Sequence, residues 1–154
     1  MCVWLLLGVV TTLAGTITAG HADGTTSTAS FNYPNGIYVD SWGIVYVADT
    51  NNDLIRKILP TGCLFLILFS SQSQDPSTVD DLCLKFVLLL CNVGHVVTIA
   101  GNWRSPSYQD GSGTNAKFFR PNGIVVGLQG LIYVSDGQSS VIRVISPNGM
   151  PRHK

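Results

Sequence analysis

The chain has 154 residues, which is enough for one domain that buries its own core. Its formal net charge is zero and only 12% of its residues are charged, so the composition gives no electrostatic reason to expect binding to nucleic acid or to an anionic membrane surface. Glycine is plentiful, and Val, Ile, Leu and Tyr cluster in short runs. Such a composition favours an all-β fold.

Residues 1–9 form an apolar N-terminal segment with no Lys or Arg before it. The segment is too short to cross a bilayer as a helix, and two interpretations stay open: the core of a secretory signal, or part of the folded domain. The chain has no Asn-x-Ser/Thr glycosylation sequence, which argues slightly against secretion. The cellular compartment therefore stays unknown.

The segment Thr11–Gly15 (TTLAG) resembles Val97–Gly101 (VTIAG) further along the chain. Each precedes a loop that holds an Asp-Gly pair, an alanine and a phenylalanine in the same order. Because the two segments recur at the same place, we predict that Thr11–Gly15 is a fourth, outer strand of a repeated unit.

The loop at residues 16–33 contains Asp23-Gly24 and Phe31, and its later equivalent contains Asp110-Gly111 and Phe118. One interpretation is a ligand-binding loop. We favour a structural one, in which Asp-Gly makes a tight turn and the phenylalanines fill the seam between neighbouring units.

Residues 34–62 (PNGIYVDSWGIVYVADTNNDLIRKILPTG) predict three short strands. The first is Gly36–Asp40, the second is the almost wholly apolar Ile44–Ala48, and the third is Leu54–Leu59. Gly43 is free to take a positive φ in the first turn, and the second turn is rich in side chains that bond their own backbone.

Residues 121–149 (PNGIVVGLQGLIYVSDGQSSVIRVISPNG) match residues 34–62 at about half of their positions, without a gap and 87 residues later. This density of matches, with glycine and proline in register, identifies an internal repeat. Three hairpin-linked strands repeated in tandem make a series of meanders, which is how the blades of a β-propeller are built.

The first copy resembles the NHL repeat in its pattern P-x-G-I-x-V-D-x-x-G-x-V-Y-V-A-D-x-x-N-x-x-I-R-K-I. The second copy departs from the pattern where Gly127 replaces the Asp and Ser139 replaces the Asn. The resemblance implies an all-β, incomplete β-propeller of the six-bladed type, with about two four-stranded antiparallel blades and a non-propeller insertion. The resemblance is specific for the fold and only weakly informative about function.

We divide the chain into five parts: an apolar segment (1–9), repeat 1 (10–62), an insertion (63–95), repeat 2 (96–149) and a tail (150–154). The insertion has two apolar patches around a polar middle, and its composition resembles nothing else in the chain. The insertion is interpreted as a segment foreign to the propeller. One hypothesis for its origin is an untranslated stretch that was wrongly retained in a gene model. Sequencing the transcript tests that origin.

Two Asp–Arg pairs recur in the repeats, each with the arginine seven residues after the aspartate. Arginine stays protonated at any working pH, so the pairs are poor candidates for acid–base catalysis. We predict that they are structural clamps, with the first aspartate also accepting hydrogen bonds from the Asn51 and Asn52 amides. The candidate site residues are the clamps Asp49, Arg56, Asp136 and Arg143, and the turn glycines Gly36, Gly43, Gly123 and Gly130.

No catalytic residue, metal site or cofactor is predicted. The cysteines form no C-x-x-C pair, the histidines show no metal-binding spacing, and residues 110–115 lack the acidic residues and terminal Glu of a calcium loop. The residues concerned are Cys2, Cys63, Cys83, Cys91, His21, His95 and His153.

For function, we predict a non-enzymatic protein-interaction module, since the family commonly presents one face to a partner. RNA is disfavoured because Arg104, Lys117 and Arg120 form only a sparse basic group. One alternative is part of a six-bladed hydrolase or lyase with a central metal, for which Asn35 and Asn122 are the only inward-facing candidates. Another is an extracellular adhesion or sensor domain. Two repeats do not close a propeller, so the remaining blades are expected from a longer chain or from self-association.

Overall fold

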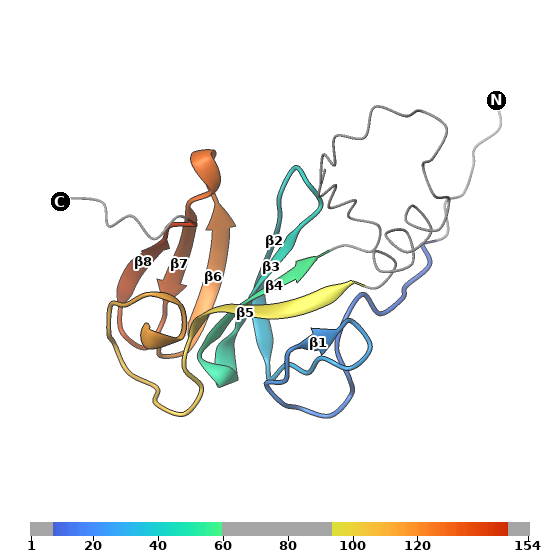
Figure 1. Ribbon diagram of the computed structural model, residues 1–154, viewed down its shortest axis with the longest axis horizontal. Coiled ribbons are helices and arrows are strands. Elements are labelled where there is room, and N and C mark those ends of the chain that lie inside the picture. The colour runs from blue at the N-terminus through green and yellow to red at the C-terminus, as the bar shows by residue number, and fades with distance from the viewer. Residues whose placement is uncertain (1–7, 60–93, 148–154) are drawn as a thin grey trace, which may run out of the picture.

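The computed structural model describes residues 8–59 and 94–147. Most of the predicted insertion, the tail, the four cysteines and His153 lie outside these ranges. Within them the chain forms two antiparallel sheets and no α-helix (Figure 1). No helix of the described residues is long and apolar enough to cross a membrane.

The first sheet has the strand order β1-β5-β4-β3-β2, and every neighbouring pair is antiparallel. Its strands are β1 (Gly24–Thr25), β2 (Pro34–Val39), β3 (Val45–Asp49), β4 (Leu54–Leu59) and β5 (His95–Gly101). The second sheet has the order β6-β7-β8, with β6 (Pro121–Val126), β7 (Ile132–Asp136) and β8 (Val141–Ile145).

Short 3₁₀ turns join some of these elements. They are η1 (Thr50–Asn52) between β3 and β4, η2 (Gly113–Asn115) before β6, and η3 (Leu128–Gly130) between β6 and β7. The tight connection from β2 to β3 is held by Asp40, whose Oδ1 accepts hydrogen bonds from the backbone N–H groups of Trp42 and Ile44 at 2.9 Å each.

The predicted three-strand meander is present in both copies. In the first copy β3 is buried along its whole length, as its unbroken apolar sequence predicts for a strand covered on both faces. Between the copies, β2 and β6 lie side by side (Figure 1), so the second sheet packs against the first.

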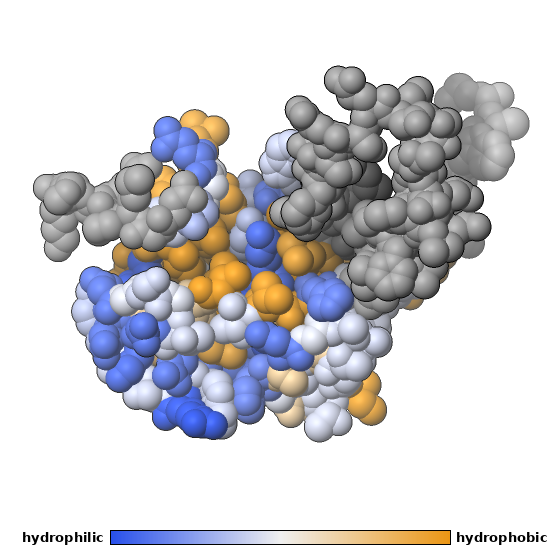
Figure 2. All heavy atoms as spheres, viewed as in Figure 1, coloured by the Kyte–Doolittle hydropathy of each residue, from blue (hydrophilic) through white to orange (hydrophobic). Residues whose placement is uncertain are grey.

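The main core lies between the two sheets, and Figure 2 shows apolar side chains gathered at this central position. A second cluster lies on the other face of the first sheet, where Ala29, Phe31 and Ala14 pack against it. The buried residues of the main core are Tyr46, Ala48, Ile55, Ala100, Ala116, Phe118, Ile132 and Val134.

The prediction of a fourth, outer strand at Thr11–Gly15 is wrong. No strand forms there, because the segment is held beside the first sheet instead: Gly15 donates its N–H to the carbonyl of Thr26, and Ala14 packs against the second cluster. Its equivalent in the second copy, Val97–Gly101, is part of β5 and pairs with β4. The fourth strand of the first sheet is therefore β5, with the short β1 outside it, and the described part of the second sheet has three strands instead of the expected four.

Two of the four predicted turn glycines do not lie in turns. Gly36 and Gly123 are inside β2 and β6, at matching irregularities in strand register. A side chain on Gly36 would collide with the backbone of Asn122 and Gly123, so this glycine allows close packing of the two sheets. Gly43 and Gly130 do lie in turns, with φ of +76° and +73°.

Candidate functional site

Each repeat holds a buried arginine that joins two aspartates from different parts of its unit. Arg56 Nη1 lies 2.8 Å from Asp49 Oδ2, and its Nη2 lies 2.8 Å from Asp23 Oδ1. The guanidinium also donates to the backbone carbonyls of Ser30 and Ala22 and lies over the Phe31 ring. We call this group the Arg56 cluster.

The second copy repeats the same arrangement, the Arg143 cluster, at positions 87 residues later. Arg143 lies 3.3 Å from Asp136 Oδ2 and 2.7 Å from Asp110 Oδ1, and its guanidinium lies over the Phe118 ring. It also donates to the carbonyls of Lys117 and Gln109.

The structure thus brings the predicted Asp–Arg pairs together and adds partners that were not predicted. Asp23 and Asp110 were interpreted as turn residues, although both occur at the same place in the repeat as the aspartates of an Asp-Gly pair. Asp23, Asp49 and Arg56 each have an identical residue 87 positions later. This shared spacing is the sequence signal that could have linked the three.

The Asp49 carboxylate accepts hydrogen bonds on both of its oxygens. Its Oδ2 accepts from Arg56 and from Asn52 Nδ2, and its Oδ1 accepts from the backbone N–H of Asn32. Burial raises the pKa of Asp49, and these donors act in the opposite direction. The predicted bond from the Asn51 amide is wrong: Asn51 Nδ2 donates to Asn32 Oδ1 instead.

The seam between the repeats is joined by polar contacts from η1 and the residue after it. Asp53 Oδ1 accepts a 2.6 Å bond from the backbone N–H of Arg120, and Thr50 Oγ1 donates to the carbonyl of Pro121 at 2.7 Å. Burial raises the pKa of Asp53, opposed by the Arg120 N–H and reinforced by the nearby charge of Asp136. The hydrogen bonds at this seam fix the two units in one relative position.

An open pocket of about 450 Å³ lies beside these contacts, at the end of the sheets where η1 is found. Arg120 Nη2 reaches Asn51 Oδ1 at 3.2 Å across it. The pocket is lined by Asn32, Asn51, Asp53, Phe119, Arg120 and Gln138.

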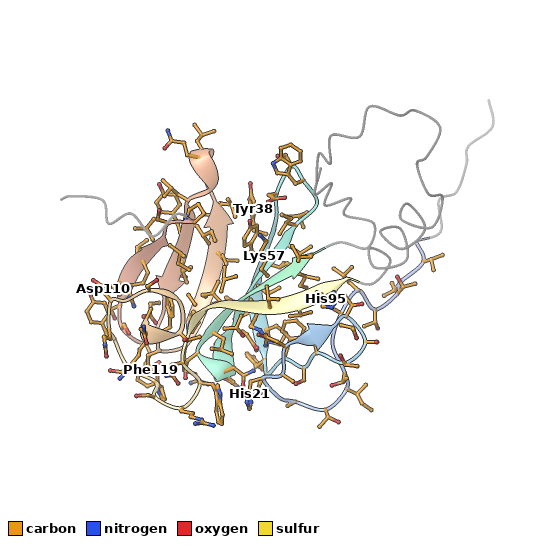
Figure 3. The ribbon with its side chains drawn as sticks, viewed as in Figure 1. His21, Tyr38, Lys57, His95, Asp110 and Phe119 are labelled. Atoms are coloured by element: carbon orange, nitrogen blue, oxygen red, sulfur yellow. The ribbon has the colours of Figure 1, made fainter. Side chains whose placement is uncertain are left out.

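Exposed aromatic side chains gather at the same end of the molecule. Trp103 follows β5, stacks on His21 with ring centroids 3.9 Å apart, and carries the Arg104 guanidinium over its ring at 5.0 Å. His21 and Phe119 lie at this end in Figure 3. We define the turn face as the surface formed by Tyr33, Trp103, Phe119, Arg104 and Arg120, all three of its aromatic rings being partly or largely exposed.

The other candidates from the sequence do not converge on a site. Asn35 and Asn122 lie exposed in β2 and β6, and residues 110–115 contribute Asp110 to the Arg143 cluster. His95 begins β5, at the opposite end of the first sheet from η1. Among the described residues, no three His, Cys, Asp or Glu side chains are grouped as metal ligands.

The fold and these clusters define the class of protein: tandem antiparallel meanders of a propeller-like kind, each with a buried arginine that pairs with two aspartates. The model of the NHL repeat family matches residues 31–58. The chain therefore contains an NHL repeat.

Three known proteins are similar to parts of this chain. Protein SUPPRESSOR OF QUENCHING 1, chloroplastic, of Arabidopsis thaliana is 49% identical over 49 residues, which is 32% of this chain and 5% of that protein. A structural genomics protein of unknown function from Bacteroides thetaiotaomicron superimposes with a TM-score of 0.59 at 23% identity, covering 86% of this chain and 26% of that one. A second structure from the same bacterium, a proposed phosphatase, gives 0.58 at 20% identity, covering 92% and 26%. At these identities the structures support the fold alone, and the chain spans a small part of each relative.

Proposed function

We propose that the chain acts as a non-enzymatic protein-interaction module and that the turn face binds the partner. The observation that carries the proposal is that the exposed rings of Tyr33, Trp103 and Phe119 and two arginines lie at one end of the sheets, where Phe119 and Arg120 line an open pocket. Aromatic residues and arginine are the side chains most enriched in the energetically important parts of protein interfaces.

The turn face is also held in place before any partner arrives. Trp103 stacks on His21 and carries the Arg104 guanidinium over its ring, and the backbone N–H of Arg120 is bonded to Asp53. A fixed side chain loses less conformational entropy on binding than a free one. By contrast, Trp42, at the opposite end of the first sheet, is 82% exposed and has no such ring partners among the described residues, so it is a suitable control position.

A protein partner fits this surface better than RNA. The turn face contributes two arginines, but the carboxylate of Asp53 lines the same pocket as Arg120, and the chain as a whole has no net charge. Binding to nucleic acid depends mainly on several cations that neutralise phosphates. The sheets left open are covered, in our proposal, by further repeats of a longer chain or by another copy.

Site-specific photo-crosslinking tests the proposal. A photoreactive amino acid replaces Trp103 in one variant and Trp42 in the control, and each protein is irradiated in an extract of its source cells. We expect a discrete, nuclease-resistant protein adduct from position 103, lost when Phe119→Ala and Arg120→Ala are added, and none from position 42. Equal adducts from both positions, or a nuclease-sensitive adduct, would overturn the proposal.

The enzyme alternative has its own test. A calorimetric titration with Ca²⁺ or Zn²⁺ is expected to give no tight stoichiometric binding if the chain is an interaction module. Tight binding of one ion per chain would support the hydrolase or lyase reading instead.

A further inference from the structure

The free edge of the second sheet corresponds to an edge that is occupied in the first sheet. In the first sheet, β5 pairs with β4, which places Val96 opposite Ile58 and Thr98 opposite Arg56. In the second sheet, β8 is the equivalent of β4, and no described strand pairs with its outer edge.

The chain contains a second segment with the sequence of β5. Residues 8–15 read GVVTTLAG, and residues 94–101 read GHVVTIAG. The segments share both glycines, a valine, a threonine and an alanine at matching positions, and their last glycines adopt nearly the same left-handed backbone, with φ of +107° at Gly15 and +104° at Gly101. Residues 8–15 form no strand, and Val9 and Val10 are almost fully exposed.

The Arg143 cluster lacks contacts that the segment would supply. In the first repeat, Asp23 accepts bonds from the Thr98 backbone N–H at 3.0 Å and from the Thr98 hydroxyl at 2.9 Å. Its equivalent, Asp110, forms an ion pair with Arg143. The Asp110 side chain is 81% exposed, whereas that of Asp23 is 47% exposed. Thr12 occupies the position of Thr98 in the segment at residues 8–15.

The segment cannot reach β8 of its own chain. Gly15 is bonded through its N–H to the carbonyl of Thr26, and Ala14 packs on the first sheet. Figure 1 shows this part of the chain beside β1, on the far side of the molecule from β8.

We propose that the edge of β8 binds residues 9–15 of a second copy of this chain, as an antiparallel fourth strand. By the register of β4 and β5, Val10 lies opposite Ile145 and Thr12 opposite Arg143, and Thr12 donates its N–H and hydroxyl to Asp110. The partner's Phe31, which is only partly buried in the single copy, then covers Ile142, which is 73% exposed, as Phe118 packs with Ile55 in the main core of this chain. The contact is head-to-tail, so it produces a ring or a continuing array. It does not depend on the proposed function.

Self-association of the chain gives the first test. Sedimentation velocity over a wide concentration range compares the wild type, the variant Val10→Pro/Thr12→Pro, and the control Ile17→Pro. Proline removes the N–H groups that strand pairing needs, and all three positions are exposed in the single copy, so the fold is retained. We expect concentration-dependent association of the wild type and the control, and a monomer for the double variant.

A peptide of residues 8–15 gives the second test. Labelled at one end, it is expected to bind the monomeric double variant by fluorescence anisotropy, and a peptide with proline at positions 10 and 12 is not. Asp110→Ala is expected to weaken peptide binding roughly tenfold, since hydrogen bonds to a charged group are lost. Circular dichroism confirms that each variant is folded. A wild type that stays monomeric, equal association of the wild type and the double variant, or a peptide that does not bind would overturn the proposal.

Discussion

The two repeats carry the same arginine cluster in different surroundings. The Arg56 side chain is fully buried, and β5 covers its outer aspartate through Thr98. The Arg143 side chain is 9% exposed, and its outer aspartate faces solvent. The same residues at the same spacing therefore reach different degrees of burial, because β5 pairs with β4 in the first sheet and no described strand pairs with the outer edge of β8. Four pairs of equivalent positions test this comparison.

Removing the arginine is expected to have the largest effect. Arg56→Ala leaves Asp49 buried without its cation and should lower the free energy of unfolding by about 3–5 kcal/mol, because breaking a buried ion pair strands a charge. Arg143→Ala should cost roughly half as much, since water reaches Asp110. Urea denaturation measures both. Equal losses would show that the burial conferred by β5 does not matter.

Gly36 and Gly123 come next. Gly36→Ala places a methyl group against the backbone of Asn122 and Gly123, which cannot move without shifting a sheet, so we expect a loss of about 1–3 kcal/mol. Gly123→Ala meets only the hydroxyl of Ser135, at 3.0 Å, which can rotate away, and should cost less. Thermal unfolding distinguishes them. A larger effect at Gly123 would contradict close packing of β2 on β6.

Thr50 distinguishes the copies because Gly137 stands at its equivalent position. Thr50→Val removes the hydrogen bond to Pro121 across the seam and should cost about 1 kcal/mol, whereas Thr50→Ser keeps the hydroxyl and should cost less. Hydrogen exchange of the amides in β6 should increase in the valine variant first. Unchanged exchange there would mean that this bond does not hold the seam.

The smallest effect concerns the pH dependence of stability. Burial raises the pKa of Asp53 above its ordinary value of 3.8, so the folded chain binds this proton more tightly than the unfolded one. The contribution of Asp53 is fully favourable below the ordinary value and is lost as pH rises through the folded pKa. Asp53→Asn should remove this decline, and Ser140→Asn, at the equivalent position, should leave it. Urea midpoints measured across the acidic range check the difference, and an unchanged pH profile in Asp53→Asn would contradict it.

Much of the fold could be read from the sequence. The alternation and turn residues of Gly36–Leu59 predicted three strands that lie within two residues of the observed β2, β3 and β4. The seven-residue spacing of Asp49 and Arg56 predicted a contact across the β3–β4 hairpin. Val47 pairs with Arg56, and Asp49, two residues after Val47, has its side chain on the same face of the sheet, where it reaches Arg56. Local hydrogen bonding and strand period set these features, and both are visible in a short window of sequence.

The site was less accessible from sequence. The turn face depends on Trp103, Phe119 and Tyr33, which come from three separate loops and lie at one end of the molecule only because the sheets bring those loops there.

The sequence by itself determined the repeat, the strands and the pairing of Asp49 with Arg56 and of Asp136 with Arg143, because these follow from periodicity and from the chemistry of neighbouring residues. Only the tertiary structure decided that β5 belongs to the first sheet, that Asp23 joins Arg56, and that the segment at Thr11–Gly15 stays unpaired. A strand finds its partner through backbone hydrogen bonds, which are the same for every sequence, so its place in a sheet depends on which edges are free.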